Sequence, residues 1–134
     1  MEFNLLLLEF NKLFIQQNER FLELGKENLH SLKANYSLIS INKFTNNKQV
    51  SSKVFELLKN NEIVITIEKV SSALKEIESD RIVAHLGREN FRKISFPVFV
   101  QSQYLKTYLE SSDHKFDLNS FIKNANFRVI ELDL

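Results

Sequence analysis

The sequence predicts an α+β fold, in which a long N-terminal helix and several short helices pack on a mixed or antiparallel sheet of about four to five strands. Apolar residues recur at helical spacing over the first 25 residues, and short β-branched runs follow them. The composition, with 43% hydrophobic and 26% charged residues, is that of a globular protein. The 134 residues contain no repeat and no long linker, so we expect one domain over 1–134.

The N-terminal helix is predicted from residue 2 to about Gly25. Its apolar stripe contains Phe3, Leu6, Leu7, Phe10, Leu13, Phe14, Phe21 and Leu24. Spacings of three and four residues place these side chains on one face of a helix. Gln17 interrupts the stripe, which argues against a sustained coiled coil. Gly25 is a candidate C-cap, and residues 26–34 could equally continue the helix.

Two strands and a short helix are predicted next. Residues 36–41 and 62–67 are rich in β-branched residues and roughly alternate, as strands do. Between them, Ser51 or Ser52 could cap a helix that ends at Leu58, because a serine hydroxyl can accept hydrogen bonds from the free N–H groups of a first turn.

A helix is predicted around 69–79, where apolar residues are spaced for one buried face. Residues 81–86 and 91–100 then look like two strands of a hairpin joined by 87–90, a loop that contains glycine. Pro97 cannot donate to a ladder, so we expect an edge position or a bulge in the second strand.

The C-terminal part is predicted to hold two helices and a strand. The first helix covers 101–109, and Asp117 or Asn119 is expected to cap a second, shorter one. Residues 127–134 alternate between apolar and charged side chains, which predicts a final strand.

Composition excludes several classes of site. The chain has no cysteine, so disulfides, thiolate metal sites and cysteine nucleophiles are ruled out. Only two glycines occur, Gly25 and Gly87, and loops that cradle phosphates need several at close spacing. A Walker-type loop and a dinucleotide-binding fingerprint are therefore excluded. We expect no cofactor.

The N-terminal apolar run is not expected to enter a membrane. It has neither the basic region nor the cleavage site of a secretory signal. Asn4, Glu9, Asn11 and Lys12 interrupt it well short of the roughly 20 apolar residues that span a bilayer. We therefore expect a cytoplasmic protein.

No catalytic residue and no metal ligand is predicted. His30, His85 and His114 lie far apart in sequence, and no two have the spacing that lets two imidazoles bind one metal from a helix face. A weaker hypothesis is an RNase-like toxin built on His85, Arg88 and Arg92. Because no catalytic set converges in the sequence, we expect a binding protein rather than an enzyme.

Two basic segments support a nucleic-acid-binding alternative. Segments 33–59 and 81–106 each carry five lysine or arginine residues against one glutamate, although the net charge of the chain is only +1. The candidate contacts in the second segment are Arg81, Arg88, Arg92, Lys93 and Lys106. A helix-turn-helix near 83–93 fails on register, but a winged-helix arrangement with 82–100 as the wing stays open.

The leading interpretation is a non-catalytic protein-interaction domain of the inhibitor, immunity or accessory-subunit type. The wide apolar stripe of the N-terminal helix is the predicted partner-binding surface. Its candidate contacts are Phe3, Leu6, Leu7, Phe10 and Phe14. A protein partner is expected, a homodimer through this helix is one form of it, and nucleic acid is the alternative partner.

Overall fold

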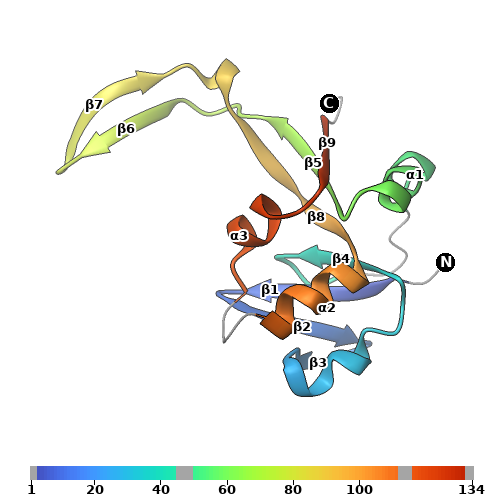
Figure 1. The fold of residues 1–134 in the computed structure, drawn as a ribbon. Coiled ribbons are helices and arrows are strands. Elements are labelled where there is room, and N and C mark those ends of the chain that lie inside the picture. The colour runs from blue at the N-terminus through green and yellow to red at the C-terminus, as the bar shows by residue number, and fades with distance from the viewer. Residues whose placement is uncertain (1–2, 45–49, 112–115, 132–134) are drawn as a thin grey trace.

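The structure of the chain, a computed structural model, describes residues 3–44, 50–111 and 116–131. Within these ranges, a seven-stranded main sheet has the order β3-β2-β1-β4-β8-β5-β9, and a separate two-stranded ribbon is formed by β6 and β7 (Figure 1). The strands are β1 (Asn4–Glu9), β2 (Lys12–Gln17), β3 (Arg20–Glu23), β4 (Tyr36–Ser40), β5 (Ile63–Lys69), β6 (Leu74–Glu78), β7 (Arg81–Leu86), β8 (Arg92–Gln101) and β9 (Phe127–Glu131). The helices are η1 (Lys26–Ser31), α1 (Ser52–Asn60), η2 (Arg88–Asn90), α2 (Ser102–Ser111) and α3 (Leu118–Lys123).

The predicted long N-terminal helix is wrong, because this part of the chain forms three antiparallel strands. β1 pairs with β2, and β2 pairs with β3. The turns between them place Phe10 and Asn18 at positive φ, a conformation that asparagine tolerates well. β1 also pairs with β4, so it lies inside the sheet and is apolar on both faces. A short apolar run of this kind cannot be told from a helix by periodicity alone.

Five strands of the main sheet run in the same direction. One of them is β3, because β3 is antiparallel to β2 and β2 is antiparallel to β1. β1 is parallel to β4, and β5 is parallel to β9, whereas β8 runs antiparallel to both β4 and β5. The amino ends of β1, β4, β5 and β9 therefore share one edge of the sheet with the carboxyl end of β8. This amino edge positions the pocket described below.

Local sequence signals correctly predicted the elements after residue 35 that lie in the main sheet or cover it. The strands expected at 36–41 and 62–67 are confirmed as β4 and β5. α1 is capped by Ser51, whose Oγ accepts a hydrogen bond from the Val54 N–H at 3.3 Å. α3 is capped by Asp117, whose Oδ1 accepts one from the Asn119 N–H at 3.1 Å. The expected helix at 101–109 is confirmed as α2, and β9 begins at Phe127.

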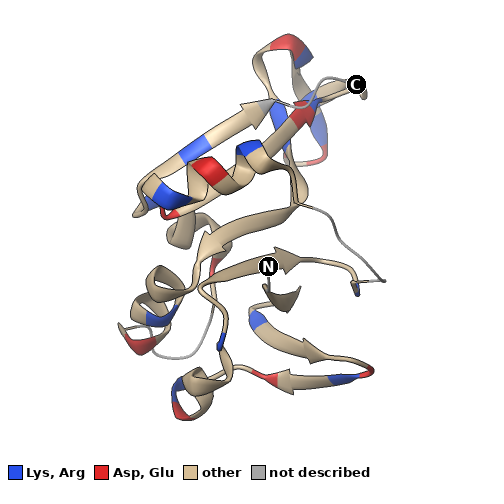
Figure 2. Cartoon of the chain, turned by 90° about the vertical axis from the view of Figure 1, so that its right-hand side faces the viewer, with Lys and Arg blue, Asp and Glu red and all other residues tan. Residues whose placement is uncertain are grey.

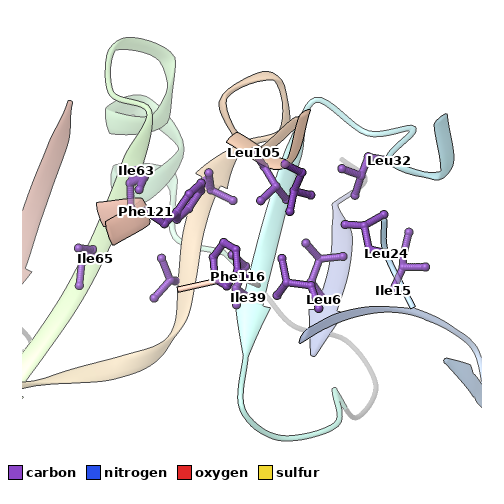
Figure 3. Close-up of a cluster of buried hydrophobic side chains, with 14 residues drawn as sticks. Leu6, Ile15, Leu24, Leu32, Ile39, Ile63, Ile65, Leu105, Phe116 and Phe121 are labelled. Carbon is purple, nitrogen blue, oxygen red and sulfur yellow. The ribbon is translucent and has the colours of Figure 1, made fainter. Parts of the chain in front are cut away.

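Apolar side chains cover both faces of the main sheet. On one face, Leu105 of α2 and Phe121 of α3 pack with Leu6, Ile39 and other strand residues in the larger cluster (Figure 3). On the other face, Val54 and Leu58 of α1 belong to a smaller cluster with strand residues. The strand residues of this cluster are Leu38, Val64 and Phe99. Figure 2 shows few charged residues on the central strands, as burial on both faces requires.

The arm, which we define as residues 74–86, projects away from the main sheet (Figure 1). The helix predicted around 69–79 is therefore wrong. Ser79 and Asp80 both have positive φ, as the two central residues of a type I′ hairpin turn do, and they join β6 to β7. The apolar spacing of 69–79 also fits a helix, but this tight turn gives β6 a partner strand.

The predicted hairpin between 81–86 and 91–100 is also wrong. β7 pairs with β6, while β8 crosses the main sheet between β4 and β5. Pro97 thus lies in a central strand rather than at an edge, but the expected bulge is confirmed. The β5–β8 register shifts between Val64 and Thr66, which face Phe99 and Ser95. Pro97 lies in the extra length of β8 at this shift.

None of the helices in the described ranges is long and apolar enough to cross a membrane. α2, with ten residues, would extend about 15 Å, which is half the thickness of a bilayer core. The cytoplasmic location stays a prediction.

Candidate functional site

A pocket of about 270 Å³ opens at the amino edge of the main sheet. It is lined by Lys33, Ala34, Asn35, Tyr36, Gln101, Ser102, Gln103 and Lys106. These residues come from two stretches of chain that meet because β4 and β8 are antiparallel, with Tyr36 directly opposite Gln101. The segment before β4 forms one wall, and the end of β8 with the first turns of α2 forms the other.

The charge of the pocket is positive. Lys33 and Lys106 approach it from opposite walls, and none of the described residues that line it is acidic. The first turn of α2 carries no acidic residue either. The nearby Glu62 carboxylate is held elsewhere, because its Oε1 accepts a hydrogen bond from the Asn126 N–H at 2.9 Å. The arrangement suits an anion.

A buried polar network lies behind the pocket wall. The Asn4 side chain is only 8% exposed, and its Nδ2 lies 3.0 Å from the Ser37 Oγ and 3.1 Å from the Ser102 Oγ. The two hydroxyls are 2.8 Å apart. The same amide bonds the backbone of Ala34, with Nδ2 donating to its carbonyl at 3.0 Å and Oδ1 accepting from its N–H at 3.1 Å. Asn4 thus fixes the lysine-bearing segment against the start of α2.

Further hydrogen bonds hold the second wall. The Ser102 N–H donates to the Asn35 carbonyl at 2.8 Å, and the Gln101 N–H donates to the Glu62 carbonyl at 2.8 Å. The Gln101 Nε2 donates to the Leu58 carbonyl at 2.6 Å. Both walls are therefore positioned by hydrogen bonds to neighbouring backbone carbonyls, and the pocket is formed without a ligand.

Chemically, this pocket can hold an anion by charge and hydrogen bonding. Side-chain amide groups from the glutamine and asparagine residues of the wall add donors to the two ammonium groups. The described lining has no carboxylate or imidazole to move a proton. In the ranges that the structure describes, no group of three or more His, Asp or Glu residues could hold a metal ion.

The structure separates the five predicted partner-binding residues. Leu6 is a fully buried core residue, and Phe3 packs on the rings of Tyr36 and Phe55. Leu7 and Phe14 face each other across β1 and β2 and are partly buried. Only Phe10, in the turn after β1, is largely exposed, at 90%. The expected single stripe does not form, and a homodimer through an N-terminal helix is ruled out because that helix is absent from residues 3–25.

The five predicted nucleic-acid contacts are also dispersed. Arg81 lies at the tip of the arm opposite Glu78, and the Arg88 guanidinium donates to the Ser71 carbonyl at 2.8 Å. The Lys93 ammonium lies 2.9 Å from a Glu68 carboxylate oxygen.

Arg92 donates to the backbone carbonyls of Glu89 and Phe91. Lys106 lies in the pocket beyond the other end of β8, a strand roughly 30 Å long. His85, the centre of the RNase hypothesis, lies on the arm with its Nδ1 next to the Lys75 ammonium. The structure therefore does not bring the five predicted nucleic-acid contacts together into one site.

Sequence reasoning found Lys106 but missed the residues that build the pocket around it. In the sequence, Asn4 only interrupts the apolar run. A strand alternation would have shown it on the same face as Leu6 and Leu8, where a polar side chain must find buried partners. Ser37 and Ser102 gave no local signal, because their role depends on contacts across 33 and 98 residues of sequence.

Comparisons with known proteins identify the fold. No protein-family model matches the chain, and no curated protein matches its sequence. Solved structures do match. The 4-diphosphocytidyl-2C-methyl-D-erythritol synthase from Anaerococcus prevotii has a TM-score of 0.53 at 19% identity, over 79% of this chain and 52% of its own. The 2-C-methyl-D-erythritol 4-phosphate cytidylyltransferase from Thermus thermophilus has a TM-score of 0.52 at 14% identity, over 81% and 56%.

A further 4-diphosphocytidyl-2C-methyl-D-erythritol synthase gives a TM-score of 0.51 at 17% identity, over 81% of this chain and 55% of its own. The chain thus spans about half the length of the structures that it resembles. This likeness overturns the interpretation as a non-catalytic interaction domain of the inhibitor, immunity or accessory-subunit type, and the nucleic-acid-binding alternative with it. The fold of the chain is similar to the fold of these structures.

Proposed function

We propose that this chain is a nucleotidyltransferase-like domain that binds a small molecule through a phosphate group, in the pocket between the segment before β4 and the start of α2. The observation that carries the proposal is the convergence of Lys33 and Lys106 on a preformed polar wall whose described residues include no carboxylate. Two ammonium groups can neutralise a phosphate, and the side-chain amide donors can bind its oxygens.

The comparisons support a phosphate-bearing ligand. One of the solved structures that share the fold is named for a 4-phosphate substrate, and others are named for a diphosphocytidyl product. The volume of about 270 Å³ is close to the lower end for small-molecule pockets. A sugar phosphate, or the phosphate end of a nucleotide, fits that size better than a whole dinucleotide.

The position of the pocket distinguishes this chain from the usual arrangement of open α/β sheets, which bind ligands outside the carboxyl ends of parallel strands. At that edge the chain turns back directly after β1, through Phe10 and Asn11. After β4, the Phe44 backbone is held by the side chain of Gln16 through bonds of 2.9 and 3.0 Å. We therefore propose binding at the amino edge.

The test is a titration of the labelled full chain followed by NMR at low salt. The probes are inorganic phosphate, a hexose phosphate and CTP, which separate a bare phosphate from a sugar phosphate and from a nucleotide. We expect the backbone resonances of 33–36 and 101–106 to shift. Each of Lys33→Met and Lys106→Met should weaken binding by about tenfold, the worth of one charge-assisted contact in a partly exposed site.

The matched control is Lys123→Met, which removes an exposed lysine from the last turn of α3. It should bind as the unsubstituted chain does. The proposal is contradicted if none of the three probes shifts these resonances, or if the control loses as much affinity as the two pocket variants.

A further inference from the structure

The two lysines of the pocket differ from other lysines of the chain in having no counter-charge. In the described ranges, the lysines that form ion pairs with a glutamate are Lys12, Lys43, Lys59 and Lys93. Neither Lys33 nor Lys106 forms an ion pair or a side-chain hydrogen bond with any described residue. Two like charges that share one pocket repel each other, so the pocket carries two unbalanced positive charges until an anion enters.

Acidic groups near the pocket do not supply this counter-charge. Glu110 follows Lys106 by one turn of α2, but no ion pair joins the two in the part of the chain that the structure describes. The carboxylate of Glu62 is held by the Asn126 N–H. The helix η1 packs against α2 and brings three further charged or titratable side chains, Lys26, Glu27 and His30. The charges of its lysine and glutamate cancel.

Free hydrogen-bond donors are divided evenly between the two walls. The side chains of Gln101 and Ser102 are already bonded to the protein, to the Leu58 carbonyl and within the Asn4 network. The side-chain amides of Asn35 and Gln103 are exposed and bond to no described residue. Each wall therefore offers one ammonium group and one free amide. A terminal phosphate has three oxygens that accept hydrogen bonds, and donors from both walls can share them.

We infer that the pocket selects a doubly charged terminal phosphate, the end group of a phosphate monoester, over singly charged anions such as a phosphate within a diester. This inference rests on the proposed function, because it names the ligand class of the same pocket. A monoester with two negative charges balances the two lysines, whereas a diester leaves one positive charge unbalanced. A diester also has one fewer free oxygen to accept a hydrogen bond.

The second negative charge of the ligand sets the expected preference. It adds one charge-assisted contact, which in a partly exposed site changes affinity by about tenfold. Lys33 is exposed and Lys106 is half-buried, so salt should reduce this preference. The measurement therefore belongs at low ionic strength.

The test compares two probes of nearly the same shape, methyl phosphate and methyl sulfate, in NMR titrations of the full chain. At about pH 8, methyl phosphate carries two negative charges, whereas methyl sulfate carries one. We expect both probes to shift the backbone resonances of 33–36 and 101–106, and methyl phosphate to bind about tenfold more tightly. Equal affinities overturn the inference but leave the proposed function standing, because both anions then bind. If neither probe shifts these resonances, the inference and the proposed function fail together.

A second titration at about pH 5 separates charge from chemical identity. Below its second pKa of about 6, methyl phosphate carries mostly one charge, as methyl sulfate does. The affinity ratio should fall to about twofold, because about a tenth of the methyl phosphate still carries the second charge. Protonation of His30 or of a nearby carboxylate adds positive charge and favours the dianion, so it cannot cause this fall. A tenfold ratio that persists at this pH overturns the inference.

Lysine variants assign the preference to the pocket. Lys33→Met and Lys106→Met each remove one of the two charges, so each should bring the ratio at about pH 8 well below tenfold. The control Lys123→Met, which removes an exposed lysine of α3, should keep the full ratio. A ratio that stays tenfold in both pocket variants, or that falls equally in the control, overturns the inference.

Discussion

The main sheet and the arm contain the same kinds of residue in opposite environments. Ile63 and Val64 of β5 are fully buried, while Ile77 and Ile82 of the arm are mostly exposed. The β5 strand is covered by helices on both faces, whereas the arm, which follows β5 in the chain, is covered on neither. Sequence patterns alone do not distinguish the two regions, because the difference arises from the layers that α1, α2 and α3 provide.

This difference implies unequal stability within one chain. A region with few buried apolar contacts opens at lower free energy than a packed core. We expect the arm to open locally at a lower free energy than the main sheet. The following predictions are arranged to test this contrast, and they begin with the largest expected effect.

Truncating the core under α3 should cost far more than truncating the arm. Phe121 is fully buried, and its ring centroid lies 4.8 to 5.0 Å from those of Tyr104, Tyr108 and Phe116. Phe121→Ala should lower the free energy of unfolding by about 3–5 kcal/mol. Ile77→Ala in the arm should lower it by about 0.5 kcal/mol or less. Urea unfolding measures both, and similar losses would remove the contrast between the two regions.

Removing a buried polar side chain from the main sheet should lower the free energy of unfolding more than removing an exposed one. Asn4→Leu leaves the Ser37 and Ser102 hydroxyls and the Ala34 N–H with fewer partners in a buried place. We expect a loss of about 1–3 kcal/mol in the free energy of unfolding, together with weaker phosphate binding. Asn119→Leu, an exposed change in α3, should leave both quantities nearly unchanged. Equal effects of the two changes would mean that the Asn4 network does not organise the pocket.

Alkaline pH should lower the free energy of unfolding through Tyr104, which lies in α2 of the helical layer. Burial, together with the charges of Glu62 and Tyr108, raises the pKa of Tyr104 above its ordinary value of 10.0. Below pH 10 the phenol is neutral in both the folded and the unfolded chain. As pH rises above 10, the unfolded chain ionises first, so the free energy of unfolding falls.

Tyr104→Phe should remove the part of this decrease in the free energy of unfolding that Tyr104 causes. The substitution also removes the hydrogen bond from the Tyr104 hydroxyl to the Phe121 carbonyl at 2.7 Å. Thermal unfolding of both proteins at several pH values between 8 and about 11 makes the comparison. Parallel pH profiles would show that Tyr104 is not the group responsible.

The sequence could predict elements whose signals are local. Ser51 and Asp117 are capping residues next to apolar runs, and both caps form as expected. The β-branched runs of β4 and β5 are strands for the same reason.

The sequence could not predict elements whose structure depends on partners far away in the chain. The first strand is leucine-rich and continuous, and only its position between β2 and β4 makes it a strand. Predicting the arm would have required recognising Ser79-Asp80 as a hairpin turn, although neither residue is the glycine that such turns favour. The pocket joins Asn4 to Ser102, and nothing near either residue in the sequence indicates the other.

Hydrogen exchange tests the central contrast most directly. The amides of Ile82 to Ala84 in β7 should exchange rapidly, while those of Ile63 to Ile65 in β5 are protected. If the β7 amides are as protected as those of β5, the account of an arm that lacks the packing of the main sheet is wrong.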